Sequence, residues 1–237
     1  MSLVDVGDRV GWVVGDVPYA AWPPIGGPAP WAALDDHLLY TCHVVADLVQ
    51  GKLGDRSPVP SMVRLSPGEL PVAVGPASRS TWRALGDGSY AHSTTLAVGR
   101  PGFVIGSLVG SALGNAVRRR QAAAAAQPRW VADGHGEVTV TDRRACFGHP
   151  QSWLDLAWDG LDTADLVAPD VFQCSFRDMY NGSPQIIQLH SLWASLIFVL
   201  AAHAAFPAHP RLLGGSWLPP DFETKCQAFG RACPQVR

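Results

Sequence analysis

Hydrophobic and polar residues alternate along several short segments of the chain's second half, the spacing typical of β-strands with one buried face. The clearest run is Val138-Thr139-Val140-Thr141, which ends at Asp142-Arg143-Arg144. The pattern continues over Trp153 to Met179 and over Gln185 to His190, and the Asn181-Gly182 pair between them is typical of a tight hairpin turn. We predict antiparallel strands of one curved sheet over these segments.

Earlier segments have the same character. Leu70 to Leu96 contains short strand-like runs with a turn signal at Asp87-Gly88. A further strand begins at Trp130, and the glycines of Asp133-Gly134-His135-Gly136 indicate a turn before the chain continues from Glu137 to Phe147. These segments should belong to the same antiparallel sheet.

Helical spacing appears on both sides of the strands. Leu34, Leu38 and Val45 recur at three-to-four spacing within a helix predicted over Pro30 to Gln50. A second helix, Leu192 to Phe206, is apolar nearly all round, so we expect it to be buried and to close the open end of the sheet. Within it, the side chains expected to face the barrel interior are Trp193, Ile197 and Leu200. A short helix should follow in the tail, with one side formed by Phe222, Cys226 and Phe229.

A segment of different character, Pro101 to Gln127, interrupts the strands and is predicted to be helical because of its alanines. Its glycines recur every four residues and its basic residues are consecutive; they are Gly106, Gly110, Gly114, Arg118, Arg119 and Arg120. One interpretation is a helix packed on the sheet with a solvated basic end. The alternatives are close pairing with a second helix in a dimer, contact with an anionic membrane surface, and coverage by the N-terminal helix. The apolar run is shorter than the roughly 20 residues that span a bilayer.

These elements predict an α+β chain in three parts. Residues 1–60 are an N-terminal extension with one amphipathic helix. Residues 61–207 are a sheet domain with a helical insertion at 101–127, and residues 208–237 are a tail with a short helix.

Two motifs resemble bacterial PH-like and GRAM-like domains. Leu65-Ser66-Pro67-Gly68-Glu69 is similar to the start of their first strand, and Val138 to Arg144 is similar to their central strand. The resemblance covers Leu65 to Phe206 and implies a PH-like antiparallel β-barrel with a C-terminal capping helix. Because its members are mostly binding or scaffolding modules, it implies a fold but no reaction. Specific inositide recognition is not expected, since the first hairpin offers only Arg79 and Arg83 and no lysine.

Composition narrows the function classes. A chain of 237 residues with 47% hydrophobic and 16% charged residues is long and apolar enough to bury a core. Its net charge of -2 provides no overall positive electrostatic field to attract nucleic acid, so nucleic acid is not expected as a partner. The five scattered cysteines and the acidic N-terminus favour a reduced, cytoplasmic protein, with attachment at a membrane surface as the alternative location. Cys226 and Cys233 could approach each other near the C-terminus.

Candidate chemistry is sparse. Asp133, His135 and Glu137 could hold a metal on one strand face, but the interleaved glycines favour a turn, and we expect no metal or cofactor. No catalytic signature is present. Of the nine tryptophans, those expected in the core are Trp153, Trp158 and Trp193, whereas Trp217 is expected to be partly exposed.

The leading hypothesis is therefore a non-catalytic PH-like module that binds a protein partner or itself. The alternatives are a peripheral membrane adaptor acting through residues 103–120 and an enzyme with an unrecognised site.

Overall fold

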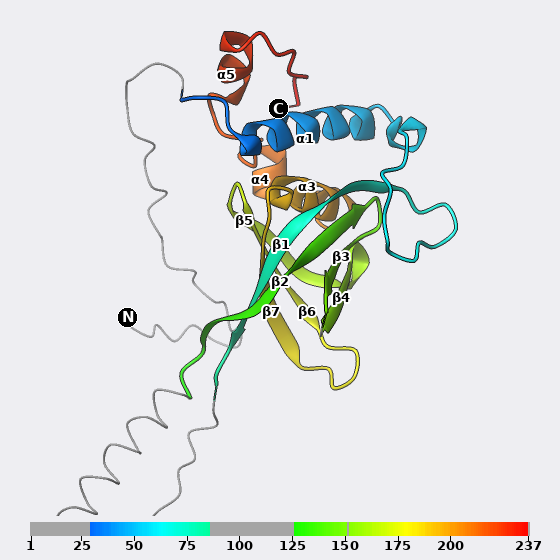
Figure 1. Ribbon diagram of the computed structural model, residues 1–237, viewed down its shortest axis with the longest axis vertical. Coiled ribbons are helices and arrows are strands. Elements are labelled where there is room, and N and C mark those ends of the chain that lie inside the picture. Colours follow the sequence, from blue (N-terminus) through cyan, green and yellow to red (C-terminus); the bar gives the residue numbers. More distant parts are fainter. Residues whose placement is uncertain (1–28, 86–125, 151, 237) are drawn as a thin grey trace, which may run out of the picture. The chain divides into compact units, whose positions relative to one another are not determined.

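The computed structural model describes residues 29–85, 126–150 and 152–236 (Figure 1). Several predicted features lie outside these residues. They are the turn at Asp87-Gly88, the strand continuing to Leu96, residues 101–125 of the expected helix, and all six candidate interaction residues, Gly106, Gly110, Gly114, Arg118, Arg119 and Arg120.

The described residues form an α+β structure around one curled antiparallel sheet (Figure 1). Its strands are β1 (Pro71–Arg83), β2 (Arg129–Thr141), β3 (Arg144–His149), β4 (Ser152–Ala157), β5 (Leu161–Ala168), β6 (Val171–Arg177) and β7 (Pro184–His190). The strand order is β4-β3-β2-β1-β7-β6-β5, and every neighbouring pair is antiparallel. The prediction of one curved antiparallel sheet is thus confirmed for this part of the chain.

β1 and β2 form the longest ladder, which runs from the Pro71–Thr141 pair to the Arg83–Arg129 pair. The turn expected at Asp133-Gly134-His135-Gly136 is wrong, because all four residues lie inside β2. The register passes from Arg79–Gly134 to Ser80–Ala132, so Asp133 is an extra residue, a β-bulge. Gly134, next to the bulge, has a φ of +138°. Glycine adopts this φ at little cost, so it allows the backbone conformation that the bulge requires.

The other two turns follow the sequence more closely. The alternating run ends where predicted, because β2 stops at Thr141 and the chain reverses into β3. Thr141 Oγ1 accepts hydrogen bonds from the backbone N–H groups of Arg143 and Arg144, which fixes this tight reversal. The Asn181-Gly182 hairpin is also confirmed, since it connects β6 to β7 and Gly182 has a φ of +67°.

Helix α3 (Ala194–Ala205) follows β7 directly and closes one end of the curled sheet (Figure 1). All residues from Ala194 to Ala202 are buried, as the continuous apolar run predicted, and each large side chain removed from water contributes roughly 1.5–3 kcal/mol. Ile197 and Leu200 are both buried, as expected. Trp193 instead precedes the helix as its N-cap residue and donates from Nε1 to the carbonyl of Val74 at 3.1 Å.

Helix α1 (Ala33–Val49) lies over α3 and confirms the predicted N-terminal helix, with its start three residues later than expected. The carboxylate of Asp35 accepts from the Ala32 N–H at 2.7 Å and caps the helix. Tyr40 donates to the carbonyl of Val72 at 2.7 Å, which attaches α1 to the start of β1. A single-turn helix η1 (Leu53–Asp55) follows.

The C-terminal segment packs into the same core. It contains α4 (Pro210–Leu213) and α5 (Phe222–Ala228), which confirms the short helix expected in the tail. Phe222 and Cys226 are buried, whereas Phe229 is partly exposed. The described residues from Trp31 onward group as one unit by their contacts, so the first helix and the tail belong with the sheet.

Four tryptophan predictions can be compared with the structure: one is right, two are wrong, and Trp193, expected in the core, is partly buried against it. Trp158, in the turn η2 (Trp158–Gly160), is only 2% exposed, as expected. Trp153 is 58% exposed, because β4 pairs Leu154 and Leu156 with the core-facing residues of β3 and Trp153 alternates to the other face. Trp217 is 2% exposed rather than partly exposed, since it lies in the core beside Leu218.

Candidate functional site on the β1–β2 ribbon

The far end of the β1–β2 ladder extends beyond the rest of the sheet. β7 pairs with β1 only over Ser78–Thr81, and β3 pairs with β2 only over Glu137–Val140. Trp82 and Arg83 therefore pair with β2 alone, and residues 129–133 pair with β1 alone. This end of the ladder, residues 79–83 and 129–133, is here called the projecting ribbon (Figure 1). Its end leads directly into residues 86–125.

Two aromatic side chains stand opposite each other on this ribbon. Trp82 pairs with Trp130 across the ladder, and their ring centroids are 5.3 Å apart in an edge-to-face arrangement. Trp82 is 42% exposed and Trp130 is 37% exposed. Exposed paired tryptophans are typical of surfaces that contact a partner, because they offer a large rigid apolar area with little entropy to lose.

The bulge residue Asp133 binds the basic residues of the ribbon. Residues at alternate positions of a strand share one face, and Arg79, Thr81 and Arg83 all reach Asp133 from β1. Arg79 Nε and Arg83 Nη2 each lie 3.0 Å from the carboxylate, whose side chain is 7% exposed. This one carboxylate fixes both arginines and neutralises one of their charges.

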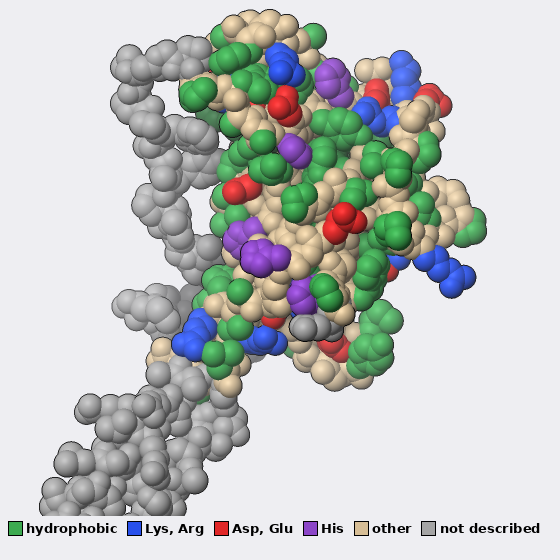
Figure 2. Space-filling model, in the orientation of Figure 1, with side chains coloured by type: hydrophobic (Ala, Val, Ile, Leu, Met, Phe, Trp, Pro, Cys, Tyr) green, Lys and Arg blue, Asp and Glu red, His purple; other side chains and the backbone are tan. Residues whose placement is uncertain are grey.

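The projecting ribbon keeps a net positive charge, because its three arginines outnumber the Asp133 carboxylate. The guanidinium of Arg79 lies over the ring of Phe147 at 5.9 Å, so it is held against the interior of the sheet. Arg83 is 53% exposed and Arg129 is exposed. Figure 2 shows basic and hydrophobic side chains next to one another at the lower left of the coloured residues, where the projecting ribbon ends.

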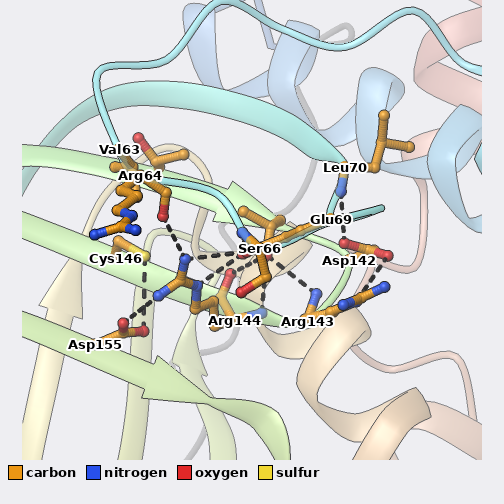
Figure 3. Close-up of polar contacts among 12 residues, drawn as sticks. Val63, Arg64, Ser66, Glu69, Leu70, Asp142, Arg143, Arg144, Cys146 and Asp155 are labelled. Atoms are coloured by element: carbon orange, nitrogen blue, oxygen red, sulfur yellow. Dashed lines mark hydrogen bonds and ion pairs between the residues drawn. The ribbon is translucent and has the colours of Figure 1, made fainter.

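A second polar cluster lies at the other end of β2 and joins the two motifs that carried the family resemblance (Figure 3). Arg144 donates from Nε and Nη2 to the two carboxylate oxygens of Glu69, at 2.7 and 3.0 Å. Its Nη1 reaches the Asp155 carboxylate on β4, and Nη2 also donates to the carbonyl of Arg64 at 2.8 Å. One guanidinium therefore fixes the 64–69 loop against β3 and β4.

The charge state of this cluster is set by burial and by its hydrogen bonds. Burial raises the pKa of Glu69, but hydrogen bonds from Arg144, from the Ser66 N–H and from Thr141 outweigh it, and the pKa of Glu69 is lowered to about 2. Because the hydrogen bond to Glu69 favours its charged form, the pKa of Arg144 is raised above its ordinary value. Both groups are charged at neutral pH and satisfy each other.

Neighbouring contacts of the motif are also internal. Asp142 Oδ1 accepts from the Leu70 N–H at 2.8 Å, and the half-exposed Arg143 donates to the carbonyls of Pro67 and Gly68. We conclude that these charged residues hold two segments of the chain together and leave little free hydrogen-bonding capacity for a ligand. Each motif is recognisable in the sequence by itself, but the pairing of Glu69 with Arg144 is not.

The hypothetical metal ligands are not brought together. Asp133 is engaged by the arginines of β1, while His135 and Glu137 are exposed. Within residues 29–85, 126–150 and 152–236, no group of three or more His, Cys, Asp or Glu side chains is placed to hold a metal ion. No helix in these same ranges is long and apolar enough to cross a membrane.

No protein-family model and no curated protein matches this chain.

Proposed function

We propose that residues 61–207 form a PH-like binding module without catalytic activity, and that its partner is a second copy of this chain. The strand order supports the PH-like assignment: two antiparallel meanders meet at β1 and β7, and α3 follows the last strand and closes one end. The resemblance implies an antiparallel barrel with a C-terminal capping helix, and this arrangement agrees with it.

The single observation that carries the binding role is the exposed Trp82–Trp130 pair on the projecting ribbon. Burying both rings against a partner would remove apolar area from water at a site already rigid through the β1–β2 ladder. The adjacent residues 86–125 contain the glycine stripe Gly106, Gly110 and Gly114, which favours close helix pairing, so self-association stays the leading form of this hypothesis.

Thiol chemistry supports a non-catalytic role. Nucleophilic cysteines need a thiolate, and burial instead raises the pKa of the Cys146 thiol to about 12, with the Asp155 carboxylate adding to the effect. Burial also raises the pKa of Cys174. Both thiols stay protonated at neutral pH.

Light scattering across a concentration series tests self-association. The wild type should approach twice the monomer mass as concentration rises, and Trp82→Ala with Trp130→Ala should shift this transition to at least tenfold higher concentration. Trp153→Ala is the matched control, because it removes an even more exposed tryptophan from β4 and should leave the transition in place. A wild type that remains monomeric at high concentration would exclude the second copy as partner.

A peripheral membrane role is the second candidate, favoured by tryptophans beside exposed Arg83 and Arg129 on the same ribbon. Tryptophan is enriched at the headgroup level of membranes, and arginines nearby are attracted to anionic lipid. Vesicles containing phosphatidylserine should then sediment the protein at low salt and release it at high salt. Changing Arg118, Arg119 and Arg120 to Ala should weaken this binding, and equal sedimentation with uncharged phosphatidylcholine vesicles would contradict it.

A further inference from the structure

The tip of the β6–β7 hairpin carries the Asn181-Gly182 pair, in which a side-chain amide is followed directly by the backbone nitrogen of a glycine. Both residues are exposed. The two residues before them, Met179 and Tyr180, are 97% and 98% exposed, so no described part of the molecule covers the tip. Water therefore has free access to this turn, which has no part in the binding role proposed for the projecting ribbon.

Local hydrogen bonds set the conformation of the turn. The backbone N–H groups of Tyr180 and Asn181 donate to Asp178 Oδ1 at 2.9 and 3.2 Å. The Gly182 N–H donates to the Asp178 carbonyl at 2.8 Å, and the Ser183 N–H donates to Asn181 Oδ1, also at 2.8 Å. Each of these bonds is made within the turn itself, at the surface, where water can replace either partner.

Two features of the turn favour attack of the Gly182 nitrogen on the side-chain amide of Asn181. The Ser183 N–H donates to Oδ1, the atom on which negative charge develops during the attack, and a donor placed there stabilises that charge. Gly182 has no side chain, and no described atom lies within 4 Å of the position that a Cβ would take, so the ring that forms has room. The hydrogen bond from Gly182 to Asp178 must open first, which costs least at an exposed loop tip.

We propose that Asn181 is a deamidation site at which water is the co-reactant. The Gly182 nitrogen loses its proton to solvent base and forms a bond to Asn181 Cγ. The Cγ–Nδ2 bond then breaks, and the amide nitrogen leaves as ammonia with a proton from solvent. One water molecule opens the resulting succinimide ring: addition at the Cγ carbonyl gives aspartate, and addition at the main-chain carbonyl gives isoaspartate. Nothing is oxidised or reduced.

Either product changes the hairpin. Both products place a carboxylate beside the Asp178 carboxylate, to which the backbone of residue 181 is hydrogen-bonded. Isoaspartate also lengthens the backbone of the turn by one carbon, and turn geometry fixes the register of a hairpin. Since Arg177 pairs with Pro184 at the end of this ladder, we expect isoaspartate to loosen the start of β7.

The test incubates the folded full-length chain at mildly alkaline pH and follows its two asparagines, Asn115 and Asn181, by peptide mass mapping. The peptide with Asn181 should gain the mass difference between an amide NH2 and a hydroxyl group, and should give two chromatographically distinct products, aspartate and isoaspartate. Fragmentation of the peptide distinguishes this change from one at Gln185 or Gln188. Asn115 is the internal control: Ala116 follows it, and because a methyl group hinders ring closure, it should react roughly tenfold more slowly.

Gly182→Ala is the matched variant, because it adds one methyl group in open space and should slow the reaction at Asn181 roughly tenfold. Circular dichroism checks that this variant is folded. Three results would overturn the proposal: reaction at Asn181 no faster than at Asn115, aspartate as the single product, or a Gly182→Ala chain that reacts as fast as the wild type. The first two are decided on the wild type even if Gly182→Ala fails to fold.

Discussion

The two ends of the curled sheet differ in how far their side chains are buried. At the capped end, α3 is buried over most of its length, and α1 covers it from outside. At the other end, the last residues of the projecting ribbon, Trp82 and Arg83, pair with β2 alone. The ribbon carries an exposed tryptophan pair, and the Asp133 carboxylate binds its residues Arg79, Thr81 and Arg83. From this difference we expect the capped end to contribute most of the stability, and substitutions on the surface of the ribbon to have little effect on the core.

The largest loss of stability should come from the capped end. Leu200→Ala should lower the free energy of unfolding by about 2–5 kcal/mol, because it leaves a cavity beneath a helix that is buried all round. Chemical denaturation measures it. A loss below about 0.5 kcal/mol would mean that α3 does not stabilise this end.

The Glu69–Arg144 cluster should come next. Glu69→Gln should cost about 3 kcal/mol at neutral pH, since the side chain is 1% exposed and its charge is stabilised by Arg144. The folded pKa of Glu69, about 2, is below its ordinary value of 4.5, so its contribution is complete above that ordinary value and is lost as pH falls towards 2. Between pH 7 and 2, the free energy of unfolding should decrease less with falling pH for Glu69→Gln than for the wild type. If the free energies of unfolding of the two proteins decrease equally with falling pH, Glu69 does not account for the loss of stability in acid.

The bulge should give an intermediate effect. Gly134→Ala forces a side chain onto a φ of +138° and places its Cβ 2.6 Å from the ring of His149, so we expect a loss of about 1–3 kcal/mol. Gly182→Ala is the matched control, because its φ is also positive but nothing lies within 4 Å of the new atom. Thermal unfolding should rank Gly134→Ala as the more damaging change. The reverse order would argue against a tightly packed bulge.

The smallest effect on stability should be at the aromatic pair. Trp82→Ala should cost less than about 1 kcal/mol, because the ring is 42% exposed and loses mainly its contact with Trp130. The same variant should have the larger effect on self-association described above. A cost comparable to that of Leu200→Ala would mean that the ribbon is part of the core, and the contrast between the two ends would fail.

Features governed by local pattern were predictable from sequence. The apolar run of α3 indicated a buried helix, and Asn181-Gly182 indicated its hairpin, because few other backbones suit those residues. The turn predicted at Gly134 and Gly136 is wrong because that prediction also relied on local pattern alone. Glycine pairs usually mark a turn, but here the distant strand β1 pairs with them and makes one continuous strand with a bulge.

Features governed by distant partners were not predictable. Glu69 and Arg144 stand 75 positions apart, and nothing local identifies them as a pair. Trp153 and Trp217 were assigned to the wrong environments because exposure depends on which face of an edge strand, or which part of the tail, meets the core. Of the candidate site, the sequence showed Arg79 and Arg83 only as too few basic residues for inositide recognition. The Trp82–Trp130 pair and the binding of both arginines by Asp133 were not predicted, since they depend on the register of the β1–β2 ladder.

The position of β1 in the strand order also bears on how the chain folds. β2-β3-β4 and β5-β6-β7 join neighbours in sequence, so each meander can form from short loops. β1 precedes both and belongs between them: Arg79 meets Asp133 across 54 positions, and Pro76 meets Ser191 across 115. Long loops must close before these contacts form, and their entropy delays closure. We therefore expect the insertion of β1 to be the late step that joins two preformed halves into one sheet.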